Sequence, residues 1–141
     1  SVGANDFMDN SCVMPSAELT AHVTKAIDSA RSAAPSGINI ILHSYCTPVR
    51  QVVPGCTLAK TGTMNDAIKA AADAASDVTF IDGLEDCGGT ATSWSPGKYH
   101  SDAVHLNKKG YCKTFTRADV QAAYGCEVAT LADCDALATS R

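Results

Sequence analysis

The segment Ile38-Asn39-Ile40-Ile41-Leu42-His43 decides the fold class of this chain. It is a short run of β-branched and other apolar residues, which is typical of a strand buried on both faces of a parallel sheet. A second run of this kind, VTFID, spans residues 78–82. Residues 16–34 and 64–76 carry apolar side chains at helical spacing. The alternation of helix, strand, helix and strand predicts an α/β fold in which helices cover parallel strands.

Local signals predict where these helices begin and end. Pro35-Ser36-Gly37 ends the first helix, and Thr63 with Asp66 resembles a capping box at the start of the second. A loop rich in glycine, threonine and serine, residues 83–101, leads to a C-terminal helical region that stops at Gly125. In that region we expect one apolar face, formed by Tyr111, Phe115 and Ala118. We also expect Thr130 with Asp133 to cap a last short helix.

The composition fits a single domain over residues 1–141. Of these residues 45% are hydrophobic and 18% are charged, which allows a real core. The net charge is −4, and basic residues do not cluster beyond Lys108-Lys109. This charge pattern argues against a nucleic-acid partner or an anionic membrane surface. No apolar run approaches the roughly 20 residues that a membrane-spanning helix needs, so no transmembrane segment is predicted.

Seven cysteines are dense for a protein of the reducing cytosol. None of them forms a C-x-x-C pair, and no carboxylate and histidine cluster has metal-ligand spacing, so we expect no metal and no cofactor. Widely spaced single cysteines predict disulfides in a secreted or lumenal protein. Because seven is odd, at least one cysteine is free or pairs outside this chain.

The sequence leaves the pairing of these cysteines open, but short loops favour two local disulfides, and a third would tie the long loop to the last helical region. We expect Cys46–Cys56, Cys126–Cys134 and Cys87–Cys112, which leaves Cys12 over. Two parallel strands also make a poor core, because parallel sheets normally have several strands covered on both faces. We therefore expect further strands in front of this chain, with Cys12 as the link to them.

Two short motifs contain residues that could take part in chemistry. Gly3-Ala4-Asn5-Asp6 is either a local turn or a block that presents the Asn5 amide to a developing oxyanion. Asp102-Ala103-Val104-His105 is either a helix-entry loop or an acid–base pair in which the carboxylate orients the imidazole.

Taken in order, the two motifs and the two strands resemble the SGNH (GDSL) hydrolase superfamily. The resemblance rests on Gly-x-Asn-Asp near the start and on Asp-x-x-His followed by Leu106-Asn107-x-x-Gly110-Tyr111. It covers only the C-terminal part of that fold, and it implies a three-layer α/β/α flavodoxin-like sandwich with its site at the carboxyl ends of the strands. In that family the matching positions make Asn5 an oxyanion-hole donor, and Asp102 and His105 two members of a Ser-His-Asp triad.

The segments around these motifs are the expected substrate-binding elements. Gly3 belongs to the first block, and Trp94, Tyr99 and His100 lie in the long loop before Asp102. Loops at strand ends commonly shape specificity, although Trp94 and Tyr99 suit a role as cover for the edge of the core equally well. The expected substrate is a small-molecule, lipid or carbohydrate ester.

The chain departs from the family pattern in one respect, because it contains no Gly-Asp-Ser block and no Gly-x-Ser-x-Gly. Three explanations remain open. An N-terminal chain of the same precursor carries the serine and the missing strands, so that the two chains form a secreted esterase. Alternatively, the chain is a non-catalytic, disulfide-rich binding module derived from such a hydrolase. The third explanation is that the resemblance is a coincidence in a small α/β protein of unknown role.

Overall fold

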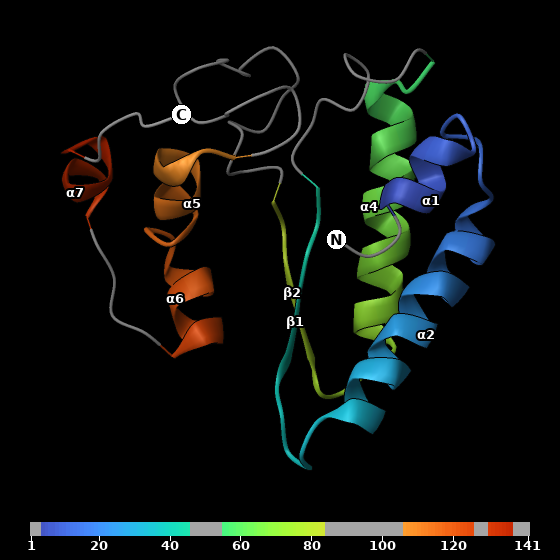
Figure 1. Cartoon of the computed structure of the whole chain (residues 1–141), viewed down its shortest axis with the longest axis horizontal. Coiled ribbons are helices and arrows are strands. Elements are labelled where there is room, and N and C mark those ends of the chain that lie inside the picture. Colours follow the sequence, from blue (N-terminus) through green and yellow to red (C-terminus); the bar gives the residue numbers. More distant parts are fainter. Residues whose placement is uncertain (1–3, 46–54, 84–105, 126–129, 137–141) are drawn as a thin grey trace.

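The computed structural model describes residues 4–45, 55–83, 106–125 and 130–136 (Figure 1). The described elements comprise six helices and two strands: α1 (Ala4–Asp9), α2 (Ser16–Ala33), β1 (Ile40–His43), α4 (Leu58–Asp73), β2 (Val78–Ile81), α5 (Lys108–Thr114), α6 (Ala118–Tyr124) and α7 (Leu131–Ala136). Within these ranges no helix has the length and apolar character needed to cross a membrane.

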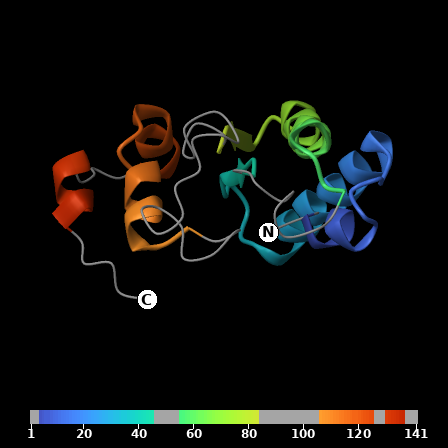
Figure 2. The ribbon, with the colours of Figure 1, turned by 90° about the horizontal axis from the view of Figure 1, so that it is seen from above.

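The two strands form a parallel sheet, as the sequence predicts. β1 pairs with β2 in a register that runs from Ile40 opposite Val78 to His43 opposite Ile81. Helices α2 and α4 lie on one side of the sheet, and α5 and α6 lie on the other (Figures 1 and 2). The chain is therefore a mixed α/β protein.

The best-packed part of the core lies where α1, α2 and α4 meet, and α2 runs along α4. Its buried side chains are mostly aliphatic, with one aromatic ring and two half-cystines: Phe7, Cys12, Met14, Leu19, Val23, Ile27, Cys56, Met64, Ala67, Ile68 and Ala71. Alternate strand residues pack against this cluster from the sheet side, namely Ile40, Leu42, Val78 and Phe80. Each fully buried large side chain contributes about 1.5–3 kcal/mol, so this cluster accounts for much of the stability.

The strands are less buried than the sequence predicts. All four residues of β1 are half-buried, and in β2 only Ile81 is fully buried. Helices lie on both sides of the sheet, so the expectation of strands covered on both faces is confirmed in part, with the strand residues only partly buried. Within the described residues each strand has a neighbouring strand on one side only, which adds to this exposure.

Helix α4 begins earlier than the expected 64–76. Its N-cap is Thr57, whose hydroxyl accepts the Lys60 N–H at 3.4 Å. Thr63 lies inside the helix, where its hydroxyl donates to the Ala59 carbonyl at 3.3 Å. The predicted capping box of Thr63 and Asp66 is therefore wrong, because a cap one and a half turns upstream already satisfies the first amides.

The C-terminal region consists of separate short helices. α5 and α6 are interrupted at 115–117, and Tyr111 is 57% exposed while Val120 is fully buried. The expected apolar face of Tyr111, Phe115 and Ala118 is therefore wrong, because the break changes which side of the chain meets the sheet.

Both predicted helix signals at the C-terminal end are confirmed. Gly125 ends α6 in the left-handed conformation, with φ 63°. Asp133 accepts hydrogen bonds from the Thr130 hydroxyl and Thr130 N–H, each at 2.7 Å, at the start of α7. These bonds hold the pKa of Asp133 below its ordinary value, since they favour the ionised carboxylate.

An ion pair ties the C-terminal end of α2 to the turn before β2. Arg31 Nε donates to Asp77 Oδ2 at 2.7 Å, and its Nη2 also donates to Asp77. Arg31 Nη1 donates to Asp28 Oδ1 at 3.0 Å. The hydrogen bonds from Arg31 lower the pKa of Asp77, so this pair contributes stability at neutral pH that is lost in acid.

The described disulfides connect segments that are distant in sequence. Cys12 pairs with Cys56, and Cys112 pairs with Cys134, with Cα–Cα distances of 5.3 and 5.4 Å. Disulfide bonding is thus confirmed. The expected pairs Cys46–Cys56, Cys87–Cys112 and Cys126–Cys134 are wrong, because in each of them one member has a different partner.

The expected role of Cys12 as a link to another chain is also wrong. Packing of α1 against the core brings Cys12 next to Cys56, directly before α4, and both side chains are buried. Three cysteines, Cys46, Cys87 and Cys126, lie outside the described residues. Because three is odd, at least one of them has no partner in this chain.

Candidate functional site

The carboxyl ends of β1 and β2 lie side by side at the top of Figure 1, and this edge is where open parallel sheets bind their ligands. The first residues beyond the strands are Ser44 and Asp82. The Ser44 hydroxyl donates to Asp82 Oδ1 at 2.9 Å and accepts the Gly83 N–H at 2.7 Å. The Ser44 N–H donates to the Ile81 carbonyl at 2.9 Å. Ser44 therefore holds the two strand ends together.

Ser44 is the described serine nearest to the expected location of a nucleophile, but its surroundings give it a structural role. Its side chain is buried, and in the described part of the chain its hydroxyl bonds to a carboxylate and a backbone amide rather than to an imidazole. The base beside Ser44 is therefore a carboxylate, which is a weaker base than an imidazole, and the described contacts contain no serine–histidine pair of the kind that activates a serine nucleophile. We therefore do not assign Ser44 as the nucleophile.

Gly83 is required by the close approach of the two strand ends. A Cβ atom built at this position would lie 2.3 Å from the Ser44 carbonyl oxygen, which is far inside van der Waals contact. The obstacle is backbone, so a side chain at position 83 forces the strand ends apart.

We expect Gly83→Ala to destabilise the protein by about 2–4 kcal/mol, because it combines overpacking with loss of the Ser44 hydrogen bonds. The matched control is Gly62→Ala in the interior of α4, where an added Cβ meets nothing within 4 Å. That change should stabilise the protein by about 0.5–1 kcal/mol, because alanine favours helix. Urea unfolding of both variants measures the difference, and equal stabilities would contradict the packing seen at the strand ends.

Asn65 of α4 fixes the direction in which the chain leaves β1. Its side-chain oxygen accepts the Tyr45 N–H, and its side-chain nitrogen donates to the Tyr45 carbonyl, each at 2.8 Å. Asn65 is buried, so this paired contact replaces the sheet hydrogen bonds that end at Ser44. Sequence reasoning missed it. The sequence pattern that could have indicated this contact is the position of Asn65, a polar residue next to Met64 on the apolar side of the expected helix.

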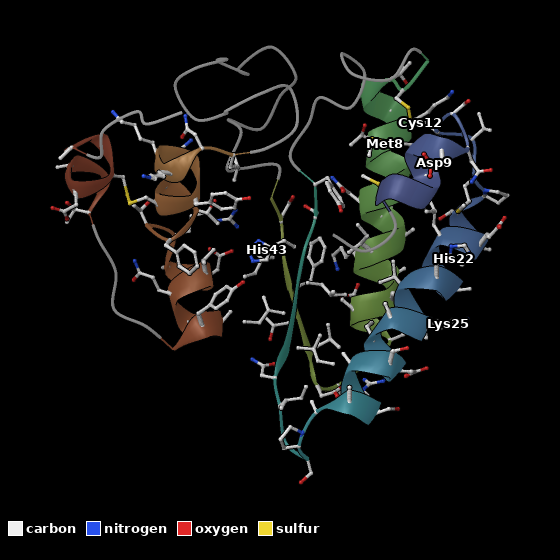
Figure 3. All side chains as sticks on the ribbon, viewed as in Figure 1. Met8, Asp9, Cys12, His22, Lys25 and His43 are labelled. Carbon is white, nitrogen blue, oxygen red and sulfur yellow. A yellow bond between two sulfur atoms is a disulfide. The ribbon has the colours of Figure 1, made fainter. Side chains whose placement is uncertain are left out.

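Helix α6 and its N-cap residue contact the carboxyl ends of both strands from the other side of the sheet. Arg117 Nη1 donates to the Asp82 carbonyl at 2.5 Å, and its Nη2 pairs with Asp119 Oδ2 at 2.6 Å. The hydrogen bonds from Arg117 hold the pKa of Asp119 below its ordinary value. His43 Nε2 and the Tyr124 hydroxyl are 3.0 Å apart, and Figure 3 shows His43 on the side of the sheet that faces α6.

The segment that contains the Gly-x-Asn-Asp motif forms the start of α1. Asn5 lies in the first turn of this helix, while Gly3 and the Asn5 side chain lie outside the description that the structure gives. Phe7 of the same helix is 1% exposed, and the following turn is joined to α4 through Cys12–Cys56. The turn after this block is therefore attached near the N-terminal end of α4, at the same end of the molecule as the carboxyl ends of the strands (Figure 1).

The second motif borders the start of α5. Asp102 and His105, together with the expected substrate-binding residues Trp94, Tyr99 and His100, lie outside the described residues. The residues that follow are described. Asn107 is the N-cap of α5, and its side chain accepts the Gly110 N–H at 2.9 Å. The asparagine and glycine of Leu-Asn-x-x-Gly thus have a structural role, because together they form the N-terminal cap of α5.

In the described ranges no group of three or more His, Cys, Asp or Glu side chains is arranged to hold a metal ion. Comparisons with family models, with curated proteins and with solved structures gave no match for this chain.

Proposed function

We propose that this chain is the C-terminal part of a secreted serine ester hydrolase of SGNH type, with its nucleophilic serine on an N-terminal chain of the same precursor. One observation supports this proposal above all. Helix α1, which contains Asn5, is joined through Cys12–Cys56 to the start of α4, and the cap of α5 follows His105 by two residues in the sequence. The starts of α4 and α5 both lie toward the end of the molecule at which the carboxyl ends of the strands lie (Figure 1).

In the proposed mechanism His105 acts as the general base. It takes the proton from the serine hydroxyl of the companion chain as the serine oxygen attacks the ester carbonyl carbon, and it returns that proton to the leaving alcohol. Asp102 orients the imidazole and stabilises the imidazolium. Asn5 donates its amide to the oxyanion of the tetrahedral intermediate. Water then hydrolyses the acyl-enzyme by the same route in reverse.

The disulfide bonds of this chain support a location outside the cytosol. Two disulfides join described segments of a 141-residue chain. Disulfides of this kind persist in oxidising compartments and are rare in the cytosol.

The need for a companion chain is supported by the sheet and by the cysteines together. Within the described residues the sheet has two strands, both only partly buried, whereas parallel sheets normally have more. At least one of Cys46, Cys87 and Cys126 has no partner in this chain, because three is odd, and a disulfide to the companion would pair it.

The test uses the protein purified from its natural source with an antibody raised against α2. Native mass measurement, repeated with and without reductant, should show a second polypeptide that contains Gly-Asp-Ser, and the preparation should hydrolyse p-nitrophenyl acetate. The native mass also detects a companion that is held without a disulfide. A 14.6 kDa monomer that unfolds cooperatively and hydrolyses no ester would overturn the proposal and favour a binding module.

A further inference from the structure

We propose that the Cys12–Cys56 disulfide is a positioning element for the oxyanion-hole donor, because it fixes helix α1 and with it the backbone of Asn5. The role of Asn5 in this inference rests on the proposed function. The anchoring of α1 rests on the length, the burial and the hydrogen bonds of the described residues around it.

Helix α1 is too short to hold its own position. It has six residues, Ala4–Asp9, and Asn5 lies in its first turn. Isolated helices of fewer than about 12 residues are marginal in water, so a helix of this length depends on tertiary contacts. The place of the Asn5 backbone is therefore decided by the contacts that anchor α1 to the rest of the chain.

Two kinds of contact anchor α1. Phe7, in the middle of the helix, is 1% exposed and belongs to the core cluster, and Met8 packs against the same cluster. Cys12 bonds to Cys56, with a Cα–Cα distance of 5.3 Å and both side chains buried. Figure 3 shows Cys12 beside the start of α4. Because Cys56 directly precedes Thr57, the N-cap of the 16-residue helix α4, the bond couples a short helix to a long one.

The turn between α1 and the disulfide has one defined conformation. Ser11 N–H donates to the Met8 carbonyl at 2.9 Å. Cys12 N–H donates to the Phe7 carbonyl at 2.8 Å, and together these are the hydrogen bonds of a Schellman helix end. Ser11 and Cys12 have positive φ angles of 54° and 57°, in a region that glycine normally occupies. Because residues other than glycine keep such angles only where the surrounding structure holds them, the disulfide and the buried Cys12 side chain stabilise this turn.

An oxyanion-hole donor needs support of this kind. Its hydrogen bond strengthens only as charge develops in the transition state, so its geometry determines kcat more than KM. A displacement of about 1 Å in a catalytic group can cost about 100-fold in rate. Helix α1 lies toward the same end of the molecule as the carboxyl ends of the strands (Figure 1). Loss of the anchor should therefore lower turnover through Asn5 while the protein stays folded.

The first experiment measures ester hydrolysis by the secreted product of the full precursor, with p-nitrophenyl acetate as the probe. Removing the bond in Cys12→Ala/Cys56→Ala should lower kcat by about 10- to 100-fold and leave KM within about threefold of the parent. Circular dichroism and native mass, recorded at the assay temperature, select conditions in which the variant is folded and its companion chain is retained. A kcat within about twofold of the parent would overturn the proposal.

The matched control is Ile27→Ala, which loosens the same core cluster away from α1. Ile27 is 2% exposed and lies in the second half of α2, whereas α1 lies toward the start of α4 (Figure 1). Its truncation should lower stability by an amount comparable to the loss of the disulfide, yet kcat should stay within about twofold of the parent. A kcat lowered equally in both variants would show a general effect of stability and overturn the positioning role.

The second experiment asks whether the disulfide acts through Asn5. Asn5→Ala should itself lower kcat by about 100- to 1,000-fold, as for other oxyanion-hole donors. Removing the disulfide from the Asn5→Ala protein should then lower kcat by less than about twofold further, because the group that it positions is already absent. Effects of the two changes that simply multiply would contradict the proposal.

A milder variant serves if the protein without the disulfide does not fold. Phe7→Leu keeps the bond and an apolar side chain but removes the ring that holds α1 in the core. It should lower kcat by at least about threefold in the parent and by less than about 1.5-fold in Asn5→Ala. Equal losses in the two proteins would overturn the proposal.

The same assays distinguish this inference from the proposed function. Hydrolysis that requires His105 and Asn5 but is insensitive to loss of the disulfide would support the enzyme and contradict the positioning role. Hydrolysis that requires His105 but not Asn5 would leave the general base in place and also contradict the positioning role. A parent protein that hydrolyses no ester would overturn both proposals.

Discussion

If the proposed function is correct, replacing His105 with alanine lowers kcat/KM for p-nitrophenyl acetate by roughly 10⁴- to 10⁶-fold in the proposed two-chain protein. The reason is that no other proposed group can take the proton from the serine and return it to the alcohol. The remaining rate would come from the oxyanion hole and from substrate binding alone.

The matched control for this prediction is His22→Ala. His22 lies on the outer face of α2, exposed and away from the strand ends (Figure 3), so its loss should leave turnover within about twofold of the parent. Thermal unfolding of both variants checks that they fold alike. Turnover by His105→Ala equal to that of the parent would refute the assignment of the general base.

Removing the Cys12–Cys56 disulfide is expected to have the largest effect on stability. The two cysteines are 44 residues apart, and closing a loop of that length is worth about 4 kcal/mol by the chain-entropy relation. The double variant Cys12→Ala/Cys56→Ala should therefore unfold at a urea concentration lower by about 2 M, given a slope of about 2 kcal/mol/M. The bond also holds α1 against the core, so α1 should lose its protection from hydrogen exchange first.

The second disulfide provides the matched control. Cys112 and Cys134 are separated by 22 residues, and their bond joins α5 to α7 rather than to the core cluster. Its removal should cost about 3 kcal/mol at most by the same relation, with α1 unaffected. A larger loss on removing Cys112–Cys134 than on removing Cys12–Cys56 would contradict the assignment of the core to α1, α2 and α4.

Local patterns predicted the main elements well. The helix expected over 16–34 is α2, and the two apolar runs are parallel strands within one or two residues of their expected ends. These features depend on helical spacing and β-branched composition, which act over a few residues. The start of α4 was misplaced because Thr57 and Thr63 are both acceptable caps. Only the path of the chain from Cys56 decides between them.

The site roles of Asn5, Asp102 and His105 stay predictions, because the Asn5 side chain and residues 102 and 105 lie outside the described residues. The patterns around Asn5 and His105 can be read directly from the sequence. The structure adds that Asn107 caps a helix and accepts the Gly110 N–H. The contact between Asn65 and Tyr45 was not predictable, because it joins a helix to a strand end twenty residues away. No local preference encodes such a pairing.

The sequence by itself determined the α/β class, the parallel direction of the strands and the presence of disulfides. Only the tertiary structure decided which described cysteines pair and why position 83 is glycine. The physical reason is distance along the chain. Helix and strand propensities arise between near neighbours, whereas Cys12–Cys56 and the contact of Gly83 with Ser44 depend on how the packed layers bring remote segments together.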